Sequence, residues 1–188
     1  MSYFQDQSFE NQNLSGDRFP EGEYEYCTFK GGNYKEANME GVTFVECTFK
    51  DCDLSLATLL ETAFREVEFI DCKLIGLHFE DCKKFGLDMS FTNCQLEHSS
   101  FFGLPLKKTT FNSCLMKGVD FTEADLTEAR LKACKLKEAK FERTILKKAD
   151  LRLSTGFEID PEINQITGAQ FSAEGLIGLL KKYKLKVD

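Results

Sequence analysis

FVECT FKDCD LSLAT LLETA FREVE FIDCK, residues 44–73, decides the fold, because a large apolar residue opens each group of five. Every fifth residue from Phe4 to Phe79, and again from Phe91 to Leu151, is Phe, Leu, Tyr or Met, without exception in 29 positions. A helix repeats its buried face every 3.6 residues and a strand every 2, so a period of five fits neither as a continuous element. A short fixed repeat of this kind indicates a solenoid.

The residue two before each large position is small or modestly apolar, and all 8 cysteines fall at this second position. Each unit therefore reads small, polar, large, polar, polar, which describes a short extended segment followed by a corner. Identical side chains recur at a step of 20, so four units make one turn of the solenoid. Allowing for one later slip of phase, the predicted core ladder is Phe9, Phe29, Phe49, Phe69, Phe91 and Phe111, and the predicted cysteine column is Cys52, Cys72, Cys94, Cys114 and Cys134.

The phase slips by two residues between Phe79 and Phe91, which places a bulge near residues 83–90. The old register would bury Lys84 there, and an unpaired buried ammonium is costly. We expect Phe85 to enter the core instead. A bulge is also a natural place for a partner to bind. The candidate partner contacts are Lys83, Lys84 and the outward Phe102.

Residues 124–126 and 149–151 both read Ala-Asp-Leu, and residues 37–39 read Ala-Asn-Met. With these units the chain resembles the pentapeptide-repeat family, whose consensus is Ala-(Asp/Asn)-Leu-X-X. The resemblance implies an all-β solenoid, a right-handed quadrilateral β-helix, here of about eight coils with a C-terminal α-helix. Each coil contacts mainly its neighbours, so the exposed ends need caps.

The sequence gives little support for catalysis. His78 and His98 are both predicted to face solvent and belong to no catalytic motif. We expect the cysteines to be reduced core residues, because side chains stacked in one column point inward in parallel, a poor geometry for disulfides. A zinc site would need a cluster such as paired C-x-x-C. We therefore expect no enzyme activity, no cofactor and no metal.

The sequence has no long apolar run and no charged-then-apolar amino terminus, so we expect a cytoplasmic protein without membrane contact. The net charge of -7 disfavours direct nucleic-acid binding. The charge is uneven: residues 1–94 carry 18 acidic and 8 basic side chains, whereas residues 95–188 carry 13 and 16.

The repeat breaks after Leu151, where Gly156 and Pro161 occupy positions that the register reserves for large residues. We expect a loop over 155–164 and a last strand over 165–171, which ends a repeat domain at residues 1–171. Residues 172–188 are predicted to form a helix, capped by Ser172, and a tail in which Leu185 and Val187 add a terminal strand. The helix either caps the last coil within one chain or joins two chains as a homodimer. The capping or dimerisation residues are Leu176, Ile177, Leu179, Leu180 and Tyr183.

This tail, together with the repeat, makes the chain similar to the quinolone-resistance pentapeptide proteins, the Qnr and MfpA group. The resemblance implies a homodimer through the C-terminal helix and a rod that imitates duplex DNA and binds DNA gyrase or topoisomerase IV. Two hypotheses remain open. The first is a DNA-mimicking binder of type II topoisomerase, and the second is an interaction scaffold with another partner and no topoisomerase role. The acidic excess also suits simple solubility.

Overall fold

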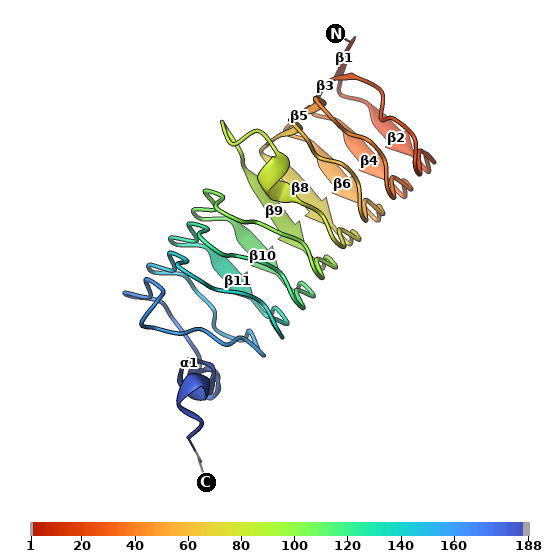
Figure 1. Ribbon diagram of the computed structural model, residues 1–188. Helices are drawn as coiled ribbons and strands as arrows, with labels where there is room; N and C mark the ends of the chain where they lie inside the picture. The colour runs from red at the N-terminus through yellow and green to blue at the C-terminus, as the bar shows by residue number, and fades with distance from the viewer. Residues whose placement is uncertain (1, 186–188) are drawn as a thin grey trace.

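The computed structural model describes residues 2–185 as a rod of stacked turns, with the amino terminus at one end and a short helix at the other (Figure 1). The strands are β1 (Ser2–Gln5), β2 (Ser8–Glu10), β3 (Gly22–Glu25), β4 (Thr28–Lys30), β5 (Thr43–Val45), β6 (Thr48–Lys50), β7 (Ala63–Arg65), β8 (Val67–Ile70), β9 (Met89–Thr92), β10 (Thr110–Asn112) and β11 (Arg130–Lys132). The helical segments are α1 (Ile177–Leu180) and the 3-10 turns η1 (Phe79–Asp81), η2 (Glu174–Leu176) and η3 (Lys181–Tyr183).

All the strands pair in parallel, in two sheets that follow two faces of the rod. The shorter sheet has the order β1-β3-β5-β7, and the longer has the order β11-β10-β9-β8-β6-β4-β2. Phe49 pairs with Phe69, which confirms the step of 20, and Phe69 pairs with Phe91, which confirms the slip of two. Beyond β11, bridges through Asp150 and Gln170 continue the longer sheet's face. The fold is the right-handed quadrilateral β-helix that the repeat predicts.

Phenylalanine rings fill the inside of the longer sheet. The rings of Phe9, Phe29, Phe49, Phe69, Phe91 and Phe111 stack in sequence, with neighbouring centroids 4.6 to 5.4 Å apart. A second stack begins at Phe79, whose ring lies 4.6 Å from Phe101 and meets Phe91 edge to face at 5.7 Å. Offset stacks and edge-to-face contacts are both favourable for aromatic rings. The two stacks therefore hold each other in register across the core.

The corners require an unusual backbone. Two positions after most large residues the chain adopts a left-handed conformation, for example at Asp51 (φ 56), Leu56 (φ 59) and Glu61 (φ 54). None of the non-glycine residues with positive φ in the described part of the chain is Val, Ile or Thr. Branching at Cβ makes this conformation especially costly. The corner therefore limits which residue types can occupy this position, although its side chain faces solvent.

Seven of the cysteines donate hydrogen bonds to main-chain carbonyls of the preceding turn. They are Cys27, Cys47, Cys52, Cys72, Cys94, Cys114 and Cys134. The thiol of Cys72, for example, lies 3.3 Å from the oxygen of Phe49. At corners such as Leu54, the carbonyl instead accepts from the amide three residues later, here that of Ala57 at 3.0 Å. The Phe49 carbonyl also accepts in the β6–β8 ladder, so the thiol is a second donor to a carbonyl oxygen with two lone pairs, and the cysteine fills space as well.

The slip of phase is absorbed by an outward loop. Phe85 is 87% exposed, so the expectation that it enters the core is wrong. Leu87 packs partly against the core and Met89 is buried in its place. We call residues 83–88 the tip loop; in Figure 1 this yellow-green segment extends beyond the stack next to η1.

Hydrogen bonds explain why the loop turns outward. The Lys83 amide still donates to Thr62 at 2.9 Å, as the 20-residue register requires. The Leu87 amide then folds back on the Lys84 carbonyl at 3.4 Å, and the Asp88 amide rejoins the preceding turn at 3.0 Å. One tight turn thus absorbs both extra residues and leaves Phe85 at its apex.

The last coil departs from the register. Phe157 and Ile159 are buried, at 3% and 1% exposure, although Phe157 lies off the five-residue period and Ile159 stands at the inward position that small residues occupy elsewhere. Residues 165–171 form single bridges at Gln165 and Gln170 but no strand, so the expected last strand is wrong. A corner at Gly168 (φ 73) divides this segment and leaves each part too short for a ladder.

The C-terminal helix rests on Phe157. The Gly175 amide donates to the Ser172 hydroxyl at 3.2 Å, and the Ile159 amide donates to the Gly178 carbonyl at 3.1 Å. A Cβ at Gly178 would lie 2.4 Å from the Phe157 carbonyl oxygen, so only glycine permits this approach. Leu185 is exposed and lies in no strand, and Val187 lies outside the described residues.

Candidate interaction surfaces

The amino-terminal half exposes carboxylates that lack basic partners. Within residues 2–94, only Glu36 and Glu80 contact a basic side chain, from Lys35 and His78 respectively. Four acidic residues line one hollow beside β6, β8 and β9, and others follow the adjoining corner in successive turns. The acidic surface comprises Glu21, Glu40, Glu46, Glu61, Glu66, Glu68, Asp81 and Asp88, all exposed.

In the carboxy-terminal half, the edge of the longer sheet that carries the acidic surface continues as a mainly basic surface. A hollow beside β11 is lined by Lys108, Arg130, Lys132, Lys148 and Arg152 together with Glu128, Asp150 and Gln170. Most acids of this half are paired, often between successive turns, as in Arg143 with Glu123 at 2.8 Å and Lys140 with Asp120 at 3.5 Å. The two halves of one scaffold therefore present opposite electrostatic surfaces.

The tip loop is a basic and aromatic island in the acidic half. Lys83 and Lys84 directly precede Phe85, and the side chain of Arg65 lies close beneath Gly86. None of these three cations forms an ion pair within the described residues. A hollow of about 590 Å³ separates Phe85 from the exposed side chain of Leu60. An exposed aromatic ring next to such a hollow is typical of a partner contact.

The structure brings together only two of the three predicted partner contacts. Lys83 and Lys84 share the tip loop, whereas Phe102 lies in the next turn and does not line the hollow beneath Phe85. Phe102 is 43% exposed and Leu60 is 45% exposed.

The C-terminal helix both covers the last coil and leaves apolar side chains exposed. Leu179 packs partly on the core, while Leu176, Ile177, Leu180 and Tyr183 are each between 41% and 54% exposed. The predicted residues thus divide between a capping side and an uncovered side of the same short helix.

Ion pairs fix this helix to the last coil. The Lys182 ammonium lies 2.6 Å from Asp160 and 2.7 Å from Glu162, and hydrogen bonding to Lys182 lowers the pKa of both carboxyl groups. The Tyr183 hydroxyl also donates to Glu162 at 2.8 Å.

Burial makes the thiols of Cys47 and Cys82 poor nucleophiles. All eight cysteines are free and buried, and burial raises the pKa of Cys47 to about 12 and also raises the pKa of Cys82. His78 and His98 are exposed. Within residues 2–185, no group of three or more His, Cys, Asp and Glu side chains is placed to hold a metal ion. No helix in this part of the chain is long and apolar enough to cross a membrane.

Two family models match separate parts of the chain. Residues 87–156 match the model described as the pentapeptide repeat region, and residues 3–79 match that described as the SV2A/B/C luminal domain. The pentapeptide-repeat match covers 70 of the 188 residues and supports the family resemblance that the repeat indicates. No protein with a curated description matches it.

Solved structures show the same fold. Two trypsin-treated variants of QnrB1, a plasmid-mediated fluoroquinolone resistance protein, align with TM-scores of 0.63 and 0.64 at 18% and 19% identity. The first alignment covers 99% of this chain and 97% of QnrB1, and the second covers 100% and 92%. HetL, a pentapeptide repeat protein involved in heterocyst differentiation regulation in the cyanobacterium Nostoc, aligns over 89% of this chain and 84% of its own at 17% identity and a TM-score of 0.46. At 18% and 19% identity the likeness to QnrB1 is one of fold.

Sequence reasoning missed two residues that define the surfaces of this protein. The sequence does hold a signal for exposed Phe85, because Gly86 stands two residues after Lys84, the spacing at which a corner follows a register position. Phe157 had no such signal, because it lies one residue off the period and is buried by a helix rather than by another coil.

Proposed function

We propose that this protein is a non-enzymatic, cytoplasmic binding rod whose acidic half occupies the DNA-binding region of a type II topoisomerase, DNA gyrase or topoisomerase IV. Residues 1–171 serve as the rod, and residues 172–188 join two rods as a homodimer. The support is electrostatic and geometric, together with a fold shared with QnrB1.

The charge density of the amino-terminal half carries the proposal. Residues 1–94 hold 18 acidic and 8 basic side chains, a net of -10. They fill about 4.7 turns, or about 22 Å at ~4.8 Å a turn, which gives roughly one net charge per 2 Å. Duplex DNA carries one charge per ~1.7 Å. Few of these acids are neutralised by ion pairs. A DNA-binding groove would therefore meet a surface whose negative charge per unit length is close to that of duplex DNA.

The uncovered side of the C-terminal helix supports the dimer. Leu176, Ile177, Leu180 and Tyr183 lie within a few residues of one another at the end of the rod. Exposed apolar residues grouped in this way typically mark a protein contact. A two-fold dimer through this end would place the two acidic halves at the far ends of a longer rod.

A gyrase cleavage assay tests the proposed function. Purified protein should reduce quinolone-stabilised DNA cleavage by the host's own gyrase at micromolar concentration. Replacing Glu46, Glu66 and Glu68 together with Gln should weaken protection by about tenfold or more, since like-charged groups act together on association. The control replaces Glu123, Glu138 and Glu142 of the other half with Gln and should keep protection. Absence of protection by the unmodified protein would contradict the proposal.

The dimer has its own test. Leu180→Glu should convert a dimer to a monomer in light scattering while the repeat remains folded, because it places a carboxylate in an apolar contact. Leu56→Glu, at an exposed leucine far from the helix, is the matched control and should leave the mass unchanged. A monomeric unmodified protein would rule out this interface.

One observation favours a second candidate, an interaction scaffold for another protein. The tip loop is basic where duplex DNA is uniformly acidic, so it requires an acidic or apolar counterpart. A pull-down that recovers one stoichiometric partner and no topoisomerase, and that fails with Phe85→Ala, would support the scaffold over the first proposal.

A further inference from the structure

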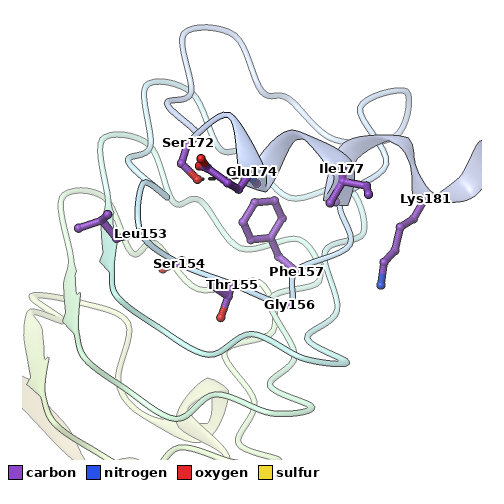
Figure 2. Close-up of a pocket in the computed structure, with 11 residues that line it drawn as sticks. Leu153, Ser154, Thr155, Gly156, Phe157, Ser172, Glu174, Ile177 and Lys181 are labelled. Carbon is purple, nitrogen blue, oxygen red and sulfur yellow. Dashed lines mark hydrogen bonds between the residues drawn. The ribbon is translucent and has the colours of Figure 1, made fainter. Parts of the chain in front are cut away.

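A pocket of about 400 Å³ lies between the last coil and the C-terminal helix. Residues 153–157 form one wall, helix residues such as Ile177 form the other, and the ring of Phe157 stands between them (Figure 2). Gly156, Gly175 and Gly178 contribute only backbone, which leaves the space open. Small-molecule sites are typically of ~300–1,000 Å³, mostly apolar, with a few placed polar groups.

The basic groups around this pocket are engaged in ion pairs, whereas one acidic group is not. Lys181 is already paired with Glu158, and Lys182 is held by Asp160 and Glu162. Glu174 lines the pocket near Phe157 and makes no ion pair within the described residues (Figure 2). The uncompensated charge at the pocket is therefore negative, and the face of an aromatic ring also attracts cations.

We propose that the pocket binds a small organic ammonium compound, a class of ligand unrelated to the proposed topoisomerase contact. Its apolar body packs on Phe157, Leu153 and Ile177, and its ammonium group meets the Glu174 carboxylate. An anionic ligand of the same shape is disfavoured because its charge would face Glu174 while Lys181 is engaged by Glu158. Burial of the apolar body supplies affinity, and Glu174 supplies selectivity.

Three probes of one shape separate these contributions: 4-phenylbutylamine, 4-phenylbutanol and 4-phenylbutyrate. Titrations of the full-length protein are followed by NMR of the Leu153 and Ile177 methyl groups. We expect saturable shifts with dissociation constants on the order of millimolar, as for a ligand of this size. The amine should bind roughly tenfold more tightly than the alcohol, and the carboxylate most weakly.

Two variants and one control sharpen the result. Glu174→Gln keeps the shape and should reduce the affinity for the amine to that for the alcohol. Thr155→Phe should fill the pocket and abolish binding of all three probes, with the thermal transition checked by circular dichroism. Glu142→Gln removes an exposed carboxylate that does not line the pocket and should change nothing.

Several results would overturn the proposal. Among them are no saturable shift at about 10 mM amine, equal binding of amine and carboxylate, or an unchanged preference in Glu174→Gln. Binding that appears only in the monomeric Leu180→Glu variant would assign the pocket to a second copy of the chain instead. Loss of gyrase protection without loss of amine binding would contradict the proposed function and leave this site standing.

Discussion

The two halves of the rod share one backbone but differ inside and out. The amino-terminal half stacks Phe and Tyr, such as Tyr24 on Phe44, and exposes unpaired carboxylates. The carboxy-terminal half has leucines such as Leu131 and Leu136 at equivalent inward positions and pairs its acids with Lys or Arg. Like charges one turn apart repel, whereas exposed ion pairs contribute only ~0–1 kcal/mol each. The comparison of the halves shows that the inward residues specify the coil, while the unpaired acids oppose its stability.

Phe49→Ala tests whether the aromatic stack holds the acidic half together. Removing a fully buried ring should cost about 4 kcal/mol, and Leu131→Ala in the other half about 3 kcal/mol. Urea unfolding followed by circular dichroism measures both values. Because each turn contacts only its neighbours, hydrogen exchange should show the loss of protection concentrated near the substituted turn. Equal loss of protection along the whole rod would mean that the halves fold as a single cooperative unit.

Phe85→Ala tests whether the tip loop contributes to binding rather than to stability. The ring is 87% exposed, so the free energy of unfolding should change by less than about 0.5 kcal/mol. Loss of an aromatic anchor at an interface typically costs about 2 kcal/mol or more of binding free energy. Titration calorimetry with the partner identified by the gyrase or pull-down experiment measures it.

The matched control for the tip is Phe102→Ala, an exposed phenylalanine in the next turn that does not line the hollow beneath Phe85. Equal losses of affinity for both variants would indicate a broad apolar contact. No loss for either would exclude the tip loop as a binding site.

Cys72→Ala tests the hydrogen-bonding role of the inward thiols. The substitution removes the thiol donor from the Phe49 carbonyl, which still accepts in the β6–β8 ladder, so the loss should be about 1 kcal/mol. Cys72→Ser should recover part of that loss, since Ser154 donates to the Leu131 carbonyl from the corresponding position in the other half. A serine variant no better than alanine would show that the cysteines act through volume alone.

The five-residue period predicts the coil, its step and its slip because inward residues repeat without exception. It does not predict where two extra residues go, because the outcome depends on hydrogen bonds: Lys83 keeps the old register and Asp88 regains it, which excludes Phe85 from the core. Nor does it predict the pocket at Phe157, which depends on how closely Gly178 lets a helix approach. The thiol hydrogen bonds are also invisible in the sequence, since they depend on which carbonyls of the preceding turn the coil geometry brings within reach of each thiol.

Low pH should destabilise the carboxy-terminal half of the rod, because it protonates ion-paired carboxylates such as that of Asp150. Hydrogen bonding to Arg152, at 2.8 Å, lowers the pKa of Asp150 below its ordinary value of 3.8. A carboxyl group with a depressed pKa contributes stability above its unfolded pKa and loses it as the pH falls through the folded value. Between pH 5 and about 3 the turns around Asp150 should therefore lose hydrogen-exchange protection, by a few tenths of a kcal/mol for so exposed a pair. Arg152→Met should remove this dependence, whereas an unchanged pH profile in that variant would show that protection depends on other groups of the same half.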